Sequence, residues 1–193
     1  MGLSDENENN TLFEVVDEND KVVSLEEKEK ILKEGLLRRV AHVWFFTPRG
    51  EIIFQHRAPD KDIFPDLLDA TVGGKVEPGV SYEDTALHET EEETGLTIKK
   101  EDLVLLEKIR VDFIDVKTNF RNNIFTTQFA YFYQGEIKDL KIEQGKIIGF
   151  EAVPIDKLFN LSQEEKQRFI RGAIDSPEFL RVLQKIKGLL LQA

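Results

Sequence analysis

The chain of 193 residues contains no cysteine and no long apolar run. The absence of cysteine excludes disulfides, thiolate metal sites and a cysteine nucleophile, and it is typical of proteins in the reducing cytoplasm, where we expect this one. A membrane-spanning helix needs roughly 18 consecutive apolar residues, and the sequence has no such run. We therefore expect neither a membrane span nor a site built on sulfur.

Positive charge is also scarce, since 26 lysines and arginines face 37 aspartates and glutamates, which gives a net charge of −11. Binding of nucleic acid requires a basic surface, so we expect no nucleic-acid partner. A small phosphorylated ligand stays compatible with this charge, because a metal ion and a few local cations can overcome the global field. The alternative is that the acidity serves only to keep the protein soluble.

The first ten residues, MGLSDENENN, are acidic and polar and do not have the pattern of a secretory signal. Gly2 begins like a myristoylation site, but Glu6 stands where that motif needs serine or threonine. We expect residues 1–10 to be a disordered lead. The rest, 11–193, is predicted to form a single domain, because 40% apolar residues and 14 phenylalanines suffice for a core.

Short strands and helices alternate irregularly along the chain. We expect strands at 11–16, 21–23, 39–47, 51–57, 103–110, 125–133 and 149–153. We expect helices at 24–34, 81–94 and 162–171, and a last helix that begins at Ser176-Pro177. Hairpins replace strict alternation of strand and helix, so the predicted fold class is α+β, a sandwich around a mixed sheet. The segment 112–123 is expected to be a variable loop.

The most informative stretch is 74–96, GKVEPGVSYEDTALHETEEETGL. In a helix over 81–94, Glu89, Glu92 and Glu93 are spaced i, i+3 and i+4, so they share one face. Carboxylates this close repel one another unless a cation neutralises them. A site made only of oxygen atoms favours Mg²⁺ or Mn²⁺, so the sequence predicts a divalent metal at this face.

The loop before this helix supports the same prediction. Gly73 and Gly74 allow the backbone to approach a ligand closely, because they carry no side chain. A carbonyl of this loop and three carboxylates would form a site with positions left for water and phosphate. Ser81 is placed to cap the helix and Gly95 to end it. The alternative is an exposed acidic helix that follows a glycine turn.

This stretch resembles the signature of the Nudix hydrolases, G-x5-E-x7-R-E-U-x-E-E-x-G-U, in which U is a bulky aliphatic residue. The matching positions are Gly74, Glu89, Glu92, Glu93, Gly95 and Leu96. The preceding strands, the GGKVEPG approach and the later segment FEAVPIDKL also look like those of Nudix domains. The resemblance implies an α/β/α sandwich with 11–38 as an N-terminal extension, 39–160 as the core and 161–193 as C-terminal helices.

The resemblance also implies a reaction, the hydrolysis of a diphosphate linkage in a small nucleoside-diphosphate-type substrate with Mg²⁺ or Mn²⁺. In such a pyrophosphatase, Glu92 and Glu93 look like metal ligands, and Glu89 looks like a ligand or the base that activates water. The Gly74 carbonyl belongs to the same implied metal site. Glu143 lies where many members of the family place a further acidic ligand. The family resemblance leaves a homodimer open.

The signature is degenerate at three positions. Val80 stands where the first glutamate belongs, His88 where the arginine belongs, and Thr90 where an aliphatic residue belongs. The family arginine orients the catalytic glutamate through a charge-assisted pair, and histidine cannot form the same fork. Loss of both charged partners leaves an alternative function open, a catalytically weak or inactive domain that binds a nucleotide or a protein.

Residues 13–95 resemble a narrower group, the isopentenyl-diphosphate isomerases and the uncharacterised Nudix hydrolases related to them. In that group an arginine of the second strand and a lysine four residues later bind the diphosphate of the substrate, and Arg57 and Lys61 match these positions. With the glycine pair Gly73 and Gly74, they form the implied substrate-binding set.

The isomerase reaction itself is not expected. The isomerases use a cysteine acid that this chain lacks, and Arg38 and Lys75 replace two of their metal-binding histidines. The histidines that are present near these positions, His42 and His56, are predicted to be strand residues with structural roles.

Overall fold

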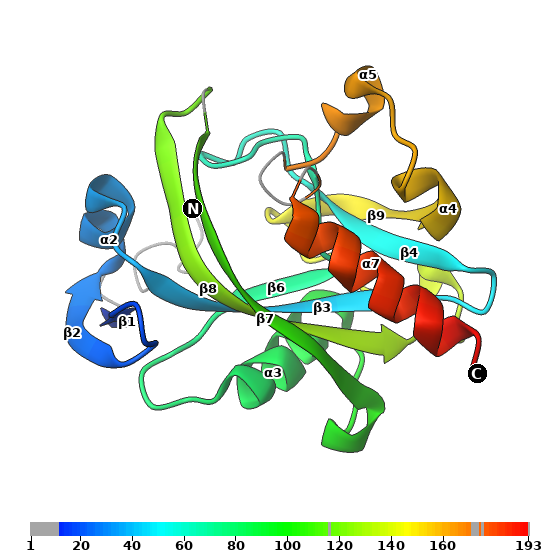
Figure 1. The fold of residues 1–193 in the computed structure, drawn as a ribbon, viewed down its shortest axis with the longest axis horizontal. Helices are drawn as coiled ribbons and strands as arrows, with labels where there is room; N and C mark the ends of the chain where they lie inside the picture. Colours follow the sequence, from blue (N-terminus) through cyan, green and yellow to red (C-terminus); the bar gives the residue numbers. More distant parts are fainter. Residues whose placement is uncertain (1–11, 116, 171–173, 175, 193) are drawn as a thin grey trace.

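The computed structural model describes residues 12–115, 117–170, 174 and 176–192, so the lead predicted for 1–10 lies outside the described residues. The described residues form one nine-stranded mixed sheet around β3 (Arg38–Phe46) (Figure 1). β3 is antiparallel to β4 (Glu51–Arg57) and β6 (Val72–Lys75) and parallel to β8 (Phe120–Phe132). The other strands are β1 (Leu12–Val16), β2 (Val22–Glu27), β5 (Leu68–Asp69), β7 (Leu103–Asp115) and β9 (Ile147–Pro154).

Two long helices pack on opposite faces of this sheet, α3 (Tyr82–Thr94) and α7 (Pro177–Leu190). Successive residues of β3 point to opposite sides, so Val43 and Phe45 pack in one core with Ala86 of α3. Trp44 packs in the other core with Phe179 of α7, at a distance of 5.2 Å between ring centroids. These two cores confirm the predicted α+β sandwich around a mixed sheet.

The shorter helices show two errors in the predicted boundaries. They are α2 (Lys28–Glu34), α4 (Ile155–Leu158), α5 (Gln163–Lys166) and the 3₁₀ turns η1 (Lys100–Asp102) and η2 (Ile137–Asp139). The helix predicted from residue 24 begins only at Lys28, because Leu25 and Glu26 pair with β1 as part of β2. The helix predicted from 162 to 171 ends at Lys166, because Phe169 forms a β-bridge with Leu68.

The loop predicted at 112–123 is wrong, because residues 112–115 and 120–123 are paired strand residues of the β7–β8 hairpin. The two strands stay paired out to Asp115 and Phe120. Across this hairpin, Arg121 binds Asp112 with both its Nε and one terminal nitrogen, at 2.9 and 2.7 Å. Asn123 is buried and donates its side-chain amide to the Gly35 carbonyl. Cross-strand pairing therefore overrides the low strand propensity of aspartate and asparagine.

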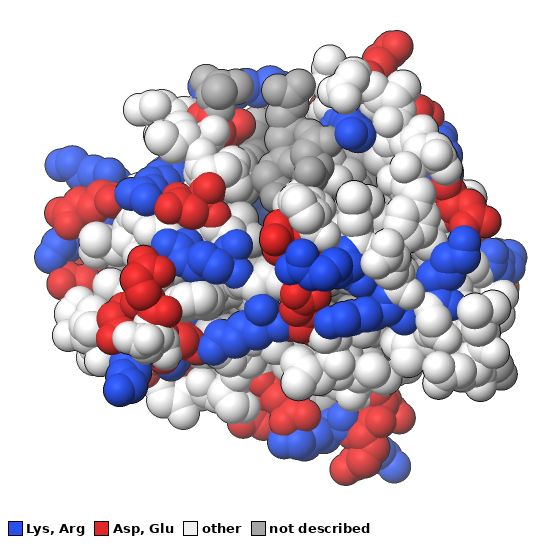
Figure 2. Space-filling view, in the orientation of Figure 1, with Lys and Arg blue, Asp and Glu red and all other residues white. Residues whose placement is uncertain are grey.

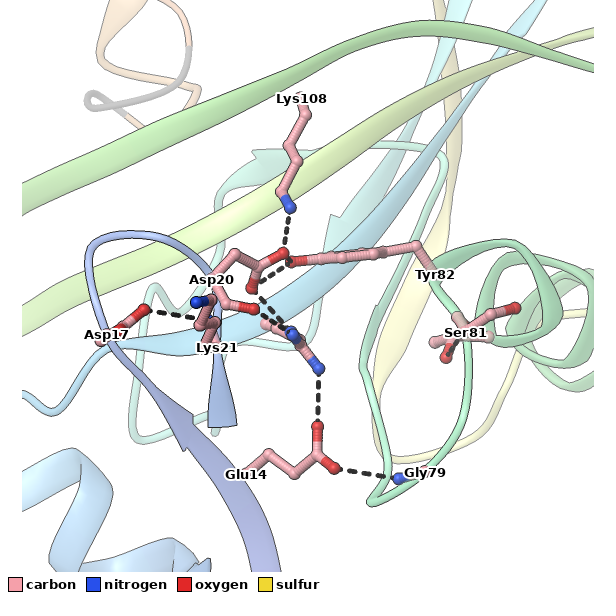
Figure 3. Close-up of polar contacts among 10 residues, drawn as sticks. Glu14, Asp17, Asp20, Lys21, Gly79, Ser81, Tyr82 and Lys108 are labelled. Carbon is pink, nitrogen blue, oxygen red and sulfur yellow. Dashed lines mark hydrogen bonds and ion pairs between the residues drawn. The ribbon is translucent and has the colours of Figure 1, made fainter. Parts of the chain in front are cut away.

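A polar network ties the β1–β2 hairpin to the segment that precedes α3 (Figure 3). Asp20, in the turn of the hairpin, accepts hydrogen bonds from Arg39, Tyr82 and Lys108. Glu14 of β1 binds Arg39 at 2.8 Å and accepts the backbone N–H of Gly79 at 3.0 Å. The N-terminal extension thus fixes the entry into the helix that carries the carboxylates.

Charges of both signs alternate on the face seen in Figure 2. The ion pairs between β7 and α7 agree with this mixture, since Arg181 and Lys185 both bind Glu107. No helix within the described residues is long and apolar enough to cross a membrane.

Candidate active site

A cavity of about 560 Å³ lies on the sheet beside α7. Every second residue of β3 lines it, because alternate residues of a strand face the same side: Arg38, Val40, His42 and Trp44. β7 and β8 contribute alternating residues in the same way. Gly73 and Gly74 of β6 and the three glutamates of α3 also belong to its lining, so the cavity contains the predicted site.

Glu93 and Glu89 are the inward carboxylates of α3. Only 6% of Glu93 is exposed, and its Oε2 accepts the backbone N–H of Gly73 at 3.1 Å. Burial and, to a smaller extent, the charge of neighbouring Glu89 raise the pKa of Glu93 to about 8, although the hydrogen bond from the Gly73 N–H lowers it. Burial likewise raises the pKa of Glu89 to about 7, with Lys146 acting against it. Both carboxylates are therefore held where ionisation is unfavourable.

The lack of a side chain at Gly74 leaves room for the side chain of Glu89. A Cβ atom on this residue would lie 2.2 Å from both Cγ and Cδ of Glu89, which is an impossible contact. The pairing of Gly74 with Ala41 fixes this glycine within the sheet, so it cannot move aside. The bare backbone of β6 therefore makes the space that the Glu89 side chain fills.

Glu92 differs from the other two glutamates because it lies at the exposed rim of the cavity. Its Oε1 is 3.4 Å from Nε2 of His88, and both side chains are about half exposed or more. The helix positions of all three glutamates agree with the predicted shared face. The structure nevertheless divides them into two inward carboxylates and one that is open to solvent.

The caps and the threonines of α3 explain how a polar helix can pack on the sheet. Ser81 accepts the N–H of Asp84, and Gly95 ends the helix in a left-handed conformation with φ of 73°, as predicted. Thr90 is fully buried where the signature has an aliphatic residue. Its hydroxyl donates to the Ala86 carbonyl at 2.6 Å, and Thr94 donates to the Thr90 carbonyl in the same way. These bonds satisfy the buried hydroxyls.

Glu143 comes from the segment before β9 and acts on the same carboxylates. Its Oε1 is 2.8 Å from Nζ of Lys146, whereas its Oε2 is buried and has no hydrogen-bond partner among the described residues. Burial opposes the charge of Lys146, but Glu143, Glu93 and Glu89 together raise its pKa. Lys146 is therefore a cation that partly neutralises the acidic cluster, and the sequence analysis did not identify it.

The donor chemistry of this cluster fits a hard divalent cation. The orphaned Oε2 of Glu143 and the destabilised charges of Glu89 and Glu93 are oxygen ligands that gain from such an ion. Among the described residues, no three acidic or imidazole side chains are arranged so that they already enclose a metal ion. Coordination would therefore require rearrangement of these side chains.

Arg57 and Lys61, the two cations of the predicted substrate-binding set, both lie in the cavity wall. Arg57 donates hydrogen bonds to the carbonyls of Ile63 and Phe64, and its Nη1 lies 3.6 Å from Oδ2 of Asp69. These bonds hold the segment after β4, where Phe64 has a φ of 52°. Lys61 has no ion pair within the described residues, so its ammonium is available to a ligand.

A buried polar chain on β3 and β8 was missed by the sequence analysis. Trp44 donates to Gln128 at 2.6 Å, and Gln128 and Thr126 both lie 3.3 Å from Nδ1 of His42. Burial lowers the pKa of His42, which favours its neutral form. His42 is a strand residue, as expected, but it also lines the cavity. Glutamine and histidine at alternate positions of otherwise apolar strands were the signal available in the sequence.

The model of the NUDIX domain matches residues 36–173, so the chain belongs to the Nudix family. An uncharacterised Nudix hydrolase of Clostridium acetobutylicum is 26% identical over 84% of this chain and 75% of its own length. An uncharacterised Nudix hydrolase of Streptomyces coelicolor is 40% identical over 84 residues. These residues are 44% of this chain and 46% of that relative, so the match spans about half of the relative's length. These relatives confirm the resemblance to the uncharacterised Nudix hydrolases.

A solved structure shows the same fold. A crystal structure from Deinococcus radiodurans superposes with a TM-score of 0.58 and is 24% identical. The superposition covers 77% of this chain and 86% of the other. The fold of the family is therefore present, and the substrate has to be inferred from the residues of this chain.

Proposed function

We propose that the protein is a Mg²⁺- or Mn²⁺-dependent hydrolase that cleaves a diphosphate linkage in a small nucleoside-diphosphate-type substrate. The observation that carries this proposal is the burial of Glu89 and Glu93 against the Gly73–Gly74 backbone at one cavity. Carboxylates with raised pKa values in a cleft are typical of catalytic sites. We place the reaction in the cytoplasm, in keeping with the absence of cysteine.

The proposed roles follow the position of each oxygen atom. Glu92, Glu93, Glu143 and the Gly74 carbonyl would hold the metal, with Glu89 as a further ligand or as the base. A pKa of about 7 suits Glu89 to accept a proton from water near neutral pH. A divalent ion, when bound, neutralises the charge of the diphosphate and makes it easier to attack.

The cations of the wall would receive the substrate. Lys61 offers an ammonium that has no ion pair among the described residues. Arg57 faces the same cavity, and its hydrogen bonds to the carbonyls of Ile63 and Phe64 hold the adjoining segment. A point charge and a planar guanidinium together suit a diphosphate. Their positions support an orientation in which the diphosphate lies between them and the glutamates.

The test is a panel of nucleoside diphosphate derivatives incubated with Mg²⁺ or Mn²⁺, with phosphate or monophosphate release as the readout. We expect turnover by the wild type and its loss in Glu93→Gln and Glu92→Gln. Glu91→Gln is the matched control, because Glu91 is exposed on the same helix. Among the described residues, its carboxylate accepts a hydrogen bond only from the hydroxyl of Thr97. Absence of both turnover and metal binding in the wild type would reject the proposal.

The second candidate, a weak or inactive domain that binds a nucleotide or protein, is favoured by Val80 and His88. His88 is exposed and contacts Glu92 rather than either inward carboxylate. The double variant Val80→Glu with His88→Arg restores the two charges of the signature. A faster reaction in this variant would attribute slow catalysis to the two departures, and an unchanged rate would reject that explanation.

A further inference from the structure

Arg38 is a buried cation that has no acidic partner among the described residues. It begins β3, lines the cavity, and only 8% of its surface is exposed. Its terminal nitrogens donate to the Asn122 side chain at 2.9 Å and to the Asn123 carbonyl at 3.4 Å. Its Nε is buried without a hydrogen-bond partner, and no carboxylate within the described residues pairs with it.

In the absence of a ligand, this arrangement destabilises the folded protein. Burial lowers the pKa of Arg38 to about 10, with no opposing effect from an acidic neighbour. A buried charge that lacks a counterion is destabilising, whereas neutral partners such as Asn122 satisfy only part of the guanidinium. An anion that enters the cavity would supply the missing charge and accept from Nε.

The position of Arg38 separates it from the carboxylates of α3. His42 is paired with Gly73, whose N–H binds Glu93, so this part of β3 lies beside the acidic cluster. Arg38 lies four residues earlier on the same strand and faces the same side, a separation of about 13 Å along the strand. A bare diphosphate held at the glutamates would not extend that far.

The surroundings of Arg38 are largely apolar. Its guanidinium lies 5.6 Å from the centroid of the Phe120 ring, and Phe120 packs against Phe64, which stacks on Phe113. Val40 lines the wall between Arg38 and His42, and Ile124 lines it beside Arg38, its partner across the β3–β8 pair. This wall suits a spacer with apolar faces, followed by a charged end group.

The net charge of the chain does not oppose an anion here. Of the described residues, six cationic and six acidic side chains line the cavity, although the chain as a whole carries a net charge of −11. The acidic groups include the three glutamates of α3, which a bound metal would neutralise.

We propose that Arg38 binds a second anionic group of the ligand, a carboxylate or a phosphate, at the end distant from the diphosphate. This inference rests on the proposed function for the location of the diphosphate. It narrows the substrate class to molecules with a diphosphate, an apolar spacer and a distal anion. Asn122 helps to hold the guanidinium, and Nε–H donates to the anion.

Binding of a simple anion to the metal-free protein tests this directly. The probes are inorganic phosphate and acetate, titrated separately, and the readout is the Nε–Hε resonance of Arg38 in ¹⁵N NMR, assigned by its loss in Arg38→Gln. We expect at least one anion to shift this resonance in a saturable manner. Saturation by phosphate or by acetate identifies which end group the site accepts.

Two variants locate the binding. Arg38→Gln is expected to weaken the affinity for the effective anion by about tenfold or more, because a charged donor is lost. Arg49→Gln is the control, since Arg49 is an exposed arginine at the far end of β3 that pairs with Glu51. If Arg38→Gln does not fold, Arg38→Lys, which keeps the positive charge but has no guanidinium Nε–H, assigns the resonance, and the wild-type titration decides. A resonance unmoved by both anions, or equal affinity in a folded Arg38→Gln, would overturn the proposal.

Kinetics separate this inference from the proposed function. Among substrates that are hydrolysed, Arg38→Gln should raise KM about tenfold for those with a distal anion and leave kcat nearly unchanged. Substrates without that group should keep their KM. If the wild type hydrolyses nothing, the proposed function fails, but the anion titration still supports or rejects the role of Arg38.

Discussion

Single residues determine where the carboxylates of this site lie. Glu93 is fixed by the N–H of Gly73, and Glu89 occupies the space that Gly74 leaves empty. These contacts join α3 to β6 at the level of individual atoms. The glycine pair and the glutamates could be recognised in the sequence, but the inward or outward direction of each carboxylate could not. That direction depends on contacts between residues distant in the chain.

The substitution Gly74→Ala tests this contact. The new Cβ would displace Glu89, and we expect activity to fall about 100-fold, since a small misplacement of a catalytic group has a large effect. The measurement is kcat/KM with the best substrate of the panel. Gly188→Ala is the control, because a Cβ there meets nothing within 4 Å. It should keep full activity, and equal losses in both variants would contradict the account.

The raised pKa of Glu93 predicts a pH effect on stability without metal. Folding raises this pKa from an ordinary 4.5 to about 8, so the folded state holds more protons than the unfolded state between these values. The stabilisation from protonated Glu93 is fully present below pH 4.5, and it is lost as the pH rises through about 8. We expect the free energy of unfolding to fall by on the order of 5 kcal/mol across this window, since each pKa unit corresponds to about 1.4 kcal/mol.

Urea unfolding in the presence of a chelator measures this effect. The variant Glu93→Gln should show a smaller decline over the same pH range, because its amide does not titrate. Parallel pH profiles for the wild type and the variant would show that Glu93 does not account for the decline.

At the scale of elements, the β1–β2 hairpin orders the approach to α3. Local signals identified α3 and both its caps, since Ser81 and Gly95 act within one turn of the helix ends. The same reasoning failed for β2, where leucine and glutamate favour a helix but pairing with β1 prevails. Nothing in the sequence distinguishes Asp20 from an ordinary turn residue, although it binds Tyr82 and Lys108 from distant segments.

Removal of the Asp20 carboxylate tests the function of this hairpin. Asp20→Asn keeps a residue that tolerates the positive φ of 59° but leaves Arg39 and Lys108 without their shared anion. We expect a loss of about 2 kcal/mol in the free energy of unfolding and faster amide exchange at Gly79 and Tyr82. Glu26→Gln, which removes the ion pair with the exposed Lys30 outside this network, is the control. Equal stability of both variants would contradict a structural role for the network.

At the scale of the whole molecule, the sheet gathers charges that are scattered along the sequence. The fold class and the acidic helix follow from patterns within short windows, and these predictions were confirmed. Lys146, Arg38 and the His42–Gln128 contact were not predictable as parts of one cavity, because their association depends on the pairing of β3 with β6 and β8. A chain with a net charge of −11 thereby contains a cavity that is lined, among the described residues, by equal numbers of cations and acids.

The identity of the bond that is broken distinguishes hydrolysis of a diphosphate from ligand binding without reaction. The best substrate of the panel is incubated with Mg²⁺ or Mn²⁺ in water enriched in ¹⁸O and followed by ³¹P NMR. If the protein hydrolyses the diphosphate, the diphosphate resonances disappear and new phosphate resonances carry the isotope shift of solvent oxygen, with neither change in Glu93→Gln. If the diphosphate resonances persist in the wild type while calorimetry shows that the ligand binds, hydrolysis is contradicted and the protein is a binding domain.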